Sequence, residues 1–511
     1  MIRTKSSITW GILLLLVCGA DSSAQTFYVD GANPASSDSN PGSEAEPYRT
    51  IAGAMAAHYG SGVTILVKPA MYDEWINVVR SGGPDQFVIR ALGSGAEVRG
   101  AGVSGRFMIT IDGFTIRGGV ALGGARNVHL TNNHIIASST NKAIYATGCD
   151  GLQIIGNTIS DSGYDGIVFR DVHTSLIEDN DICRSVNKGL VLNALNDGTI
   201  GIIIRRNRFY ENGASAICFD IRAHDSVTIQ NLMWDNQHGL EHRASFSNRH
   251  LGDVIWGNRN DGVWIKDGVT DLTIANCIIA ENGTGNSSSY HVYIDSLSVV
   301  PEMNDNVYSF SSGQPLFKHG SQAYATLAAW TSATGQDTRS FNEPPRFRDP
   351  ENQDFHLTQR SPAVDCANTN LDGWPETDTD GLGPLDDPRI ANTGIGAITY
   401  ADRGAFEFVP STLAVGDNVA ASERSLTMSP NPMRATGQIE YVLGRREIVR
   451  LTVVDLQGRT IATLEQGSRA AGRHSAIWNG HGVRGRAQSG VYFLRLETSE
   501  RRLAKRFALV R

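Results

Sequence analysis

The chain has 511 residues, of which 41% are hydrophobic and 19% are charged, so it is neither a disordered nor a fibrous protein and can build a large core plus a further domain. Its net charge of −8 is divided unevenly, since residues 428–511 carry 15 Lys and Arg against 6 Asp and Glu, and the remainder carries 30 against 47. An acidic body argues against nucleic acid as a partner.

The first 24 residues have the features of a secretory signal. Arg3 and Lys5 precede an apolar run at 10–17, and a small residue, Ala24, ends the segment. A run this short is typical of a signal peptide and is too short for a membrane span. We therefore expect residues 1–24 to be removed and the protein to be secreted or attached to the outer-membrane surface.

Residues 26–70 have the features of a cap. A short β-rich segment at 27–30 is followed by a loop rich in Asn, Pro and Ser, an Ala-rich stretch at 52–58 and an apolar run at 62–69. We expect a first strand, a short helix and then the first coil of a repetitive structure. A helix over the open end would protect strand edges that could otherwise template aggregation.

Residues 133–282 repeat one short phrase, in which a polar register residue separates two apolar pairs. The register residues are Asn133, Asn157, Asn180, Asn207, Asn231, Asp253 and Asn276. Their spacing of 22–27 residues is typical of a solenoid. The intervening segments are β-branched and punctuated by glycine, with no helical period. We therefore expect parallel, in-register strands, with the register side chains bonded along the axis.

This pattern resembles the right-handed parallel β-helix of the pectate-lyase-like superfamily over about residues 26–310, and the N-terminal part is most similar to polysaccharide lyase family nine. The resemblance implies an all-β fold: a right-handed parallel β-helix solenoid with a short N-terminal capping helix, spanning residues 25–409 with its caps. It also implies an extracellular polysaccharide as partner. Many activities share this fold, so the resemblance is specific for the fold.

The candidate chemistry has to be sought in the geometry of the coils, since the chain has no Walker loop, zinc motif, nucleophile elbow or dinucleotide fingerprint. One strand of each coil follows a small residue, and side chains two and four positions later should point outward. The first outward column is Tyr145, Val168, Val191, Cys218, Glu241 and Trp264. The second is Thr147, Arg170, Asn193, Asp220, Arg243 and Lys266.

Neighbouring coils lie about 4.8 Å apart, which should bring charged and aromatic residues into one sugar-sized patch. Its predicted members are Asp220, Glu241, Arg243, Trp264 and Lys266. Outward aromatic side chains offer flat faces to pyranose rings. The predicted substrate-binding residues are Trp264, Tyr145, Arg170 and Asn193. His238 lies near this patch, whereas His242 falls in an inward column and should be a core residue.

Three functions remain open for the patch. In lyases of the superfamily that the chain resembles, a cation neutralises the uronate and a Lys or Arg removes its C5 proton. The resemblance therefore implies Lys266 or Arg243 as base, with Asp220 and Glu241 as calcium ligands. In a glycoside hydrolase, Asp220 and Glu241 would form the carboxylate pair. A non-catalytic glycan-binding protein or adhesin is the third possibility, and surface ion pairs alone would also explain the charges.

The family-nine calcium motif, Asp-Asp-Gly-Phe-Asp, is replaced here by Asn260-Asp261-Gly-Val-Trp264, and the family's lysine position is not kept. A polysaccharide lyase acting by β-elimination on a pectate- or uronate-type polymer nevertheless stays our first expectation. No catalytic residue can be transferred from the family by its motif.

Residues 320–409 are similar to the terminal cap of bacterial β-helix proteins. Glu376, Asp378, Asp380 and Asp387 have the acidic spacing of a calcium loop, so calcium is the expected cofactor and these four residues its candidate ligands. A solvated acidic turn is the alternative.

Residues 410–427 read as a linker, and residues 428–511 as alternating strands of a small immunoglobulin-like β-sandwich. This module resembles the C-terminal sorting domain of the type IX secretion system, which implies the outer-membrane secretion machinery as a partner. An accessory carbohydrate-binding module is the alternative. We expect a monomer, and the five cysteines after the signal show no disulfide pattern, which favours buried thiols.

Overall fold

The computed structural model describes residues 25–410 except 94, 138–140, 284, 286–287 and 311–315. It also describes residues 426–509 with gaps at 430–432, 434–435, 444–446, 455–458, 470–471, 483–484, 489 and 499–501. The expected signal and most of the expected linker lie outside the described residues. The α-helices are α1 (Ile51–Ala57) and α2 (Leu327–Thr334), and no described helix is long and apolar enough to cross a membrane.

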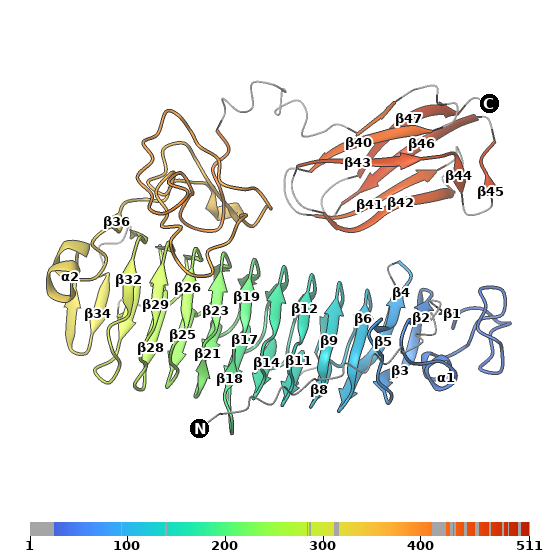
Figure 1. The fold of residues 1–511 in the computed structure, drawn as a ribbon, viewed down its shortest axis with the longest axis horizontal. Coiled ribbons are helices and arrows are strands. Elements are labelled where there is room, and N and C mark those ends of the chain that lie inside the picture. The colour runs from blue at the N-terminus through green and yellow to red at the C-terminus, as the bar shows by residue number, and fades with distance from the viewer. Residues whose placement is uncertain are drawn as a thin grey trace, which may run out of the picture.

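The main body is a parallel β-solenoid with three faces, whose rungs stack from α1 to α2 (Figure 1). Face one consists of β1 (Gln25–Val29), β2 (Val63–Val67), β4 (Phe87–Ala91), β6 (Phe107–Asp112), β9 (Arg126–Thr131), β12 (Gln153–Ile155), β15 (Leu176–Glu178), β19 (Ile203–Arg205), β23 (Val227–Ile229), β26 (Arg249–Leu251), β29 (Thr273–Ala275) and β32 (Glu302–Asn304). Face two consists of β7 (Thr115–Ile116), β10 (His134–Ile136), β13 (Thr158–Ser160), β16 (Asp181–Cys183), β20 (Arg208–Tyr210), β24 (Leu232–Trp234), β27 (Val254–Trp256), β30 (Ile278–Ala280), β33 (Val307–Ser309) and β36 (Phe341–Asn342).

Face three consists of β3 (Ala70–Val78), β5 (Ala96–Ser104), β8 (Val120–Gly123), β11 (Ile144–Thr147), β14 (Ile167–Arg170), β17 (Leu190–Asn193), β21 (Ser215–Phe219), β25 (His238–Arg243), β28 (Val263–Lys266), β31 (Val292–Ile294) and β34 (Phe317–His319). The first part of β5 pairs with β7 of face two and the last part with β8 of face three, so this long strand turns the corner between faces two and three. Short strands β18 (Thr199–Ile200) and β22 (Ala223–His224) pair beside the stack, and β35 (Gln322–Tyr324) turns back antiparallel to β34.

The predicted register residues form a hydrogen-bonded ladder at the corner between faces one and two. The main-chain N–H and the Nδ2 of Asn133 both donate to Oδ1 of Asn157, at 2.9 and 3.1 Å. The same pair of bonds links each of the next residues, from Asn157 to Asp253. Buried amides are thereby satisfied along the axis, as the repeat predicted.

The prediction that Asn276 continues this ladder is wrong. Ala275 is level with Leu251 and Ile278 with Val254, so Cys277 stands at the ladder position. The Cys277 N–H donates to Oδ1 of Asn306 in the next rung, at 3.0 Å. Asn276 precedes it at φ 54°, in the left-handed region that Asn tolerates better than most residues.

A second ladder lies at the corner between faces two and three. Asn212, Asn236, Asn258 and Asn282 follow one another in successive rungs, and each N–H donates to the next Oδ1 at 3.1 Å. Their spacing of 24, 22 and 24 residues was visible in the sequence. Only the first corner ladder was predicted from such a spacing.

A further buried polar group of the solenoid is a chain of side chains around two histidines. His242 is fully buried, as its inward column predicted, and its ring stacks on Phe219 with centroids 4.6 Å apart. Its Nε2 lies 2.7 Å from Nε2 of His250, whose Nδ1 lies 2.6 Å from the Thr228 hydroxyl. Burial lowers the pKa of His242 to about 3, so this histidine is neutral in the folded protein.

Helices close both ends of the stack (Figure 1). In α1 the Thr50 hydroxyl accepts the Gly53 N–H at 2.9 Å, and Ile51, Ala54 and Met55 are buried. In α2, Trp330 stacks on Phe317 of the last rung, with centroids 4.9 Å apart. Both helices are short, so their stability comes from this packing rather than from helix propensity.

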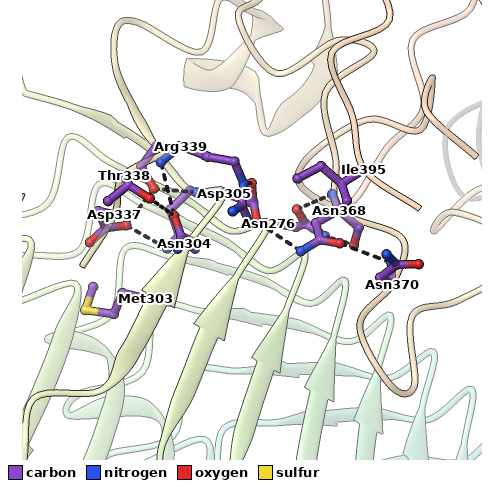
Figure 2. Close-up of polar contacts among 12 residues, drawn as sticks. Asn276, Met303, Asn304, Asp305, Asp337, Thr338, Arg339, Asn368, Asn370 and Ile395 are labelled. Carbon is purple, nitrogen blue, oxygen red and sulfur yellow. Dashed lines mark hydrogen bonds and ion pairs between the residues drawn. The ribbon is translucent and has the colours of Figure 1, made fainter. Parts of the chain in front are cut away.

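Residues 341–409, here called the strap, fold back over the side of the solenoid (Figure 1). The strap contains β37 (Phe347–Asp349), the single 3₁₀ turn Pro350–Asn352 and β38 (Asp354–Leu357). Its apolar side chains, including Phe355 and Phe406, cover Trp234, Val254 and Ile278 of face two. Figure 2 shows one polar attachment, where Asn276 and Asn368 exchange two hydrogen bonds of 2.9 Å.

The C-terminal residues form two antiparallel sheets around their own apolar core. The first sheet is β39 (Leu426–Ser429), β40 (Gly437–Leu443) and β43 (Gly472–Trp478). The second is β41 (Glu447–Val454), β42 (Thr460–Arg469), β46 (Gly490–Glu497) and β47 (Arg502–Leu509), with a small ribbon of β44 (His481–Gly482) and β45 (Gly485–Arg486). Ile439, Leu451 and Leu494 are fully buried between the sheets, which gives the expected β-sandwich.

Candidate functional site

Face three presents the two predicted outward columns in register. Glu241 is level with Trp264, and Arg243 with Lys266, on the paired strands β25 and β28. Ile265, which lies between Trp264 and Lys266 on β28, is 0% exposed. The alternation along these strands therefore puts the charged and aromatic side chains outside and the aliphatic ones inside.

Glu241 is the centre of the patch. Its Oε2 accepts the Ser215 hydroxyl at 2.7 Å and lies 2.8 Å from Nζ of Lys188, and its Oε1 lies 3.2 Å from Nζ of Lys266. Burial alone would raise the pKa of Glu241, but the charge and hydrogen bond of Lys188, with Ser215 and Lys266, lower it to about 2. Burial likewise opposes the charge of Lys188, yet Cys218 and Glu241 raise the pKa of that lysine. Glu241 is therefore ionised at neutral pH.

Asp220 and Arg243 form a separate bidentate pair beside it. Nε and Nη2 of Arg243 lie 2.7 and 2.6 Å from the two carboxylate oxygens of Asp220. The hydrogen bonds to Asp220 raise the pKa of Arg243 above its ordinary value. Arg243 is thus unsuited to remove a proton, which weakens one of the two predicted bases.

Trp264 is held between two cation-forming side chains. The His238 ring stacks on it with centroids 4.6 Å apart, and Nζ of Lys266 lies 3.1 Å from its ring centroid. His238 Nδ1 is 3.5 Å from an Asp261 carboxylate oxygen. The indole is nevertheless partly exposed.

A third outward column was missed by the sequence analysis. It is the position immediately before the small residue of each coil, where the chain turns onto face three. Its members are Lys142, Asp165, Lys188, Ser215, His238, Asp261 and Tyr290. The sequence contains a signal for this column, since every member except Tyr290 directly precedes the small residue, Gly or Ala, of its coil. Lys188 reaches across two rungs from this column to Glu241, which no single-strand alternation would reveal.

The predicted substrate-binding residues of the earlier rungs lie together. The Arg170 guanidinium is 5.7 Å from the Tyr145 ring centroid, and its Nε donates to Oδ1 of Asn193 at 3.3 Å. Nζ of Lys142 lies 5.4 Å from both the Tyr145 and the Tyr164 rings. Between this group and Glu241 the same column is apolar and buried, with Val168, Val191 and Cys218 packed in one cluster.

A further group lies at the C-terminal end of face three. Lys318 Nζ is 5.4 Å from the Tyr290 ring centroid and 5.0 Å from that of Tyr293. Tyr293 is level with Trp264 on the preceding rung, and Lys318 with Tyr293. Cation–aromatic pairs therefore recur along the face.

The carboxylates of the patch do not fit a catalytic calcium ion. Asp220 is occupied by Arg243, and Glu241 by two lysines and a hydroxyl, so neither oxygen pair is free for a cation. Within the described ranges, no three His, Cys, Asp or Glu side chains converge as a metal site.

The predicted calcium loop of the strap does not fit the ion either. Asp378 accepts main-chain N–H groups from Asp380 and Leu382 at 2.9 and 2.7 Å, and Glu376 is exposed. Asp380 lies 2.8 Å from His356, and Asp387 pairs with Arg389 at 2.8 Å. Although burial opposes its charge, His356 has its pKa raised to about 9 by Asp354 and Asp380. The loop is thus closed by protein partners.

Comparison with known families supports the handedness of the solenoid. Residues 95–249 match the family model described as right handed beta helix region. The solenoid is a right-handed β-helix. The match covers less than half of the chain. No curated protein matches the chain.

Several solved structures resemble this β-helix at low identity. The A-module of Azotobacter vinelandii mannuronan C-5 epimerase AlgE4 is 16% identical with a TM-score of 0.42, over 62% of this chain and 100% of that one. Pectate lyase Pel9A is 15% identical with a TM-score of 0.36, over 76% and 97%. The GH136 lacto-N-biosidase from Eubacterium ramulus is 12% identical with a TM-score of 0.37, over 62% and 66%. At such identities the likeness concerns the fold alone.

Proposed function

We propose that the β-helix binds an acidic polysaccharide along face three. The observation that carries this proposal is the recurrence of cation–aromatic pairs on that face, at Lys142 with Tyr145, Arg170 with Tyr145, Lys266 with Trp264, and Lys318 with Tyr290 and Tyr293. Aromatic faces bind the apolar side of sugar rings, and the cations beside them bind carboxylate or sulfate groups.

The cations at the two ends of the face support an anionic ligand. Among the described residues, Lys142, Arg170 and Lys318 form no ion pair, although the body of the chain is acidic. A local row of cations can bind a polyanion against the net charge, since charges more than about 10 Å away are largely screened at 0.1 M salt. Binding should therefore weaken as salt is added.

A polysaccharide lyase acting by β-elimination is the second candidate, and the position of Lys266 favours it. Lys266 lies beside the partly exposed Trp264, where a sugar ring would stack, while Lys188 holds the shared Glu241. In the proposed step Lys266 first gives up its ammonium proton, and the neutral amine then takes the C5 proton of a uronate. The C–H electron pair forms the C4–C5 double bond, and the C4–O bond breaks with its electron pair moving to the departing sugar oxygen, which takes a proton from water. Glycoside hydrolysis is disfavoured, because the lowered pKa of Glu241 leaves it no proton to donate.

A binding and activity screen tests both candidates. The mature protein is retained on immobilised pectate, alginate or a glycosaminoglycan, and the ultraviolet absorbance of an unsaturated product is followed in solution. We expect K142A/R170A to lose most retention, and R126A, which removes an exposed arginine of face one, to keep it. Equal retention of both variants, or none by the wild type, rejects the binding proposal. Product formed by the wild type and lost in K266A supports the lyase, and silence with retained binding rejects it.

We further propose that residues 428–511 act as a secretion address recognised by the outer-membrane machinery. The resemblance to a sorting domain, an apolar core of its own and the excess of Lys and Arg support this role. A carbohydrate-binding module would instead add to the retention measured above when it is present.

A further inference from the structure

Four buried carboxyl groups of the strap are linked through main-chain hydrogen bonds. Asp365 is 0% exposed, Asp378 and Asp402 are each 2% exposed, and Glu407 is 6% exposed. Two of them are well satisfied by the main chain. Asp402 accepts the N–H groups of Asp365 and Phe408 at 2.7 and 2.5 Å, and the second oxygen of Asp378 accepts the Glu407 N–H at 2.9 Å.

The other two carboxyl groups are not satisfied. Within the described part of the chain, neither oxygen of the completely buried Asp365 has a hydrogen-bond partner at normal distance, although the Asp387 N–H is close enough to lower the pKa of the group, and Oε2 of Glu407 has none either. Oε1 of Glu407 accepts the Asp402 N–H at 3.2 Å. A buried carboxylate without partners is costly, so these three oxygens require a positively charged or protonated counterpart.

No side chain among the described residues supplies that charge. The nearby Arg403 is held by Asp305 and by the Cys366 carbonyl, which its Nε meets at 3.0 Å. Arg389 is paired with Asp387, and His356 lies between Asp354 and Asp380. Each cation around the cluster thus already has its own acceptor.

The titration of the two groups agrees with this geometry. Burial, and then the charges of Asp386 and Asp387, raise the pKa of Asp365 to about 6. Burial, with the charges of Asp378 and Asp365, raises the pKa of Glu407 to about 8.

We propose that Asp365 and Glu407 bind a divalent cation of the calcium class. Calcium takes six to eight oxygen ligands, and main-chain carbonyls and water commonly provide several of them. Since no three acidic, His or Cys side chains of the described residues converge, such oxygens must complete the shell here. This site differs from the loop predicted at Glu376–Asp387, whose oxygens already have protein partners.

The cation would fasten the strap to the solenoid. Asp365 directly precedes the segment in which Asn368 docks on Asn276 (Figure 2), and Glu407 follows Gly404, whose N–H donates to the Asn276 carbonyl at 2.8 Å. Asp365 and Glu407 therefore each lie within three residues of a strap residue that bonds to Asn276. Cross-linking them through a cation would hold both attachments at once.

Calcium-dependent thermal unfolding of the mature protein tests the site. The protein is treated with EGTA at pH 7.5, then unfolded without metal and with millimolar CaCl₂, and native mass spectrometry measures bound calcium. We expect CaCl₂ to raise the unfolding temperature by several degrees and one calcium ion to remain bound. D365N and the isosteric E407Q should lose both effects, whereas E376Q, which alters only the exposed loop carboxylate, should keep them.

Three outcomes would overturn the proposal. An unchanged wild type with no bound calcium would mean that protons neutralise the cluster. A calcium response kept in D365N or E407Q would place the ion elsewhere, and a response lost in E376Q alone would place it in the predicted loop. If a variant does not fold, the wild-type mass and unfolding temperature still decide between the first outcome and the proposal.

Discussion

At Glu241 a single buried carboxylate holds two lysines and a serine hydroxyl on face three, and its stability contribution depends on pH. Its pKa is lowered, so this contribution is fully present above the ordinary value of 4.5 and is lost as pH falls toward about 2. The arrangement makes the carboxylate a structural support of the two lysines.

Replacing Glu241 with Gln should therefore destabilise the protein at neutral pH. The change leaves Lys188 and Lys266 with reduced compensation, and we expect a loss of about 2–3 kcal/mol, below the 3–5 kcal/mol of a fully buried pair because both lysines keep some solvent contact. Urea unfolding at pH 7 and pH 3 measures it, and the difference from wild type should shrink at pH 3. Asp73→Asn, in an exposed ion pair, is the control and should cost less than about 0.5 kcal/mol. An equal loss at both pH values would contradict the assignment.

The alternation on β28 predicts opposite effects for two neighbouring residues. Ile265→Ala removes buried methylene groups from the close-packed core and should cost about 2–5 kcal/mol. Trp264→Ala acts on the outer face and should stay within about 1 kcal/mol of wild type. Equilibrium unfolding of both variants measures the difference. A reversed order would mean that the outer and inner columns are exchanged by one residue.

At the scale of single elements, the ladder of amide side chains is interrupted at Cys277. Asn231 donates two hydrogen bonds to Asp253, whereas Cys277 donates only its main-chain N–H to the next rung. Its thiol makes weak contacts of 3.5 Å to the His250 carbonyl of the preceding rung and of 3.4 Å to the Ala275 carbonyl of its own rung. The interruption lies directly beneath the docked strap.

Cys277→Asn should repair the ladder. An Asn side chain there can accept the Asp253 N–H and donate to a carbonyl of the preceding rung, as its neighbours in the ladder do. We expect a gain of about 0.5–1.5 kcal/mol, the usual net worth of a hydrogen bond. Thermal unfolding measures it, with Asn207→Ala in the intact ladder as the opposite control, expected to lose about 1–3 kcal/mol. A destabilised C277N would show that the thiol is held too tightly for an amide.

The features that could be predicted from sequence are those that recur in every rung. The corner amides from Asn133 to Asn231 and the alternation at Trp264 and Ile265 follow from a period and a pleat. Cys277 could not be chosen over Asn276, because only the backbone conformation distinguishes two adjacent positions at a corner. The contact of Lys188 with Glu241 could not be predicted from the alternation along a strand, because Lys188 lies in the third outward column, where the chain turns onto face three.

The position of the strap could not be predicted from the sequence, for another reason. Its contacts join segments without a period, and the hydrogen bond between Asn368 and Asn276 spans 92 residues. The sequence of 320–409 predicted a terminal cap, but α2 closes the end of the stack while residues 341–409 cover its side. Only the folded solenoid defines the surface that these residues recognise.

At the scale of the whole molecule, the β-helix and the C-terminal sandwich have separate cores. Deleting residues 428–511 should therefore leave the unfolding temperature of the β-helix unchanged, because none of its core residues is removed. In the native host the same deletion should abolish surface delivery if the sandwich is the secretion address. Calorimetry of the purified protein and fractionation of cells measure the two effects. Unchanged delivery would contradict the proposed role.

The position of the strap restricts how such a chain could grow by internal duplication. Its apolar contacts begin at Tyr210 of β20 and continue to Val307 of β33. A duplicated rung between β10 and β16 would lengthen face three by about 4.8 Å and leave every strap contact in place. The same insertion after β23 would move Tyr210 away from Val254 and Ile278, so the strap could no longer cover all three. Length variation among chains built this way should therefore be concentrated in the N-terminal half, where it changes only how much of a polymer the face can span.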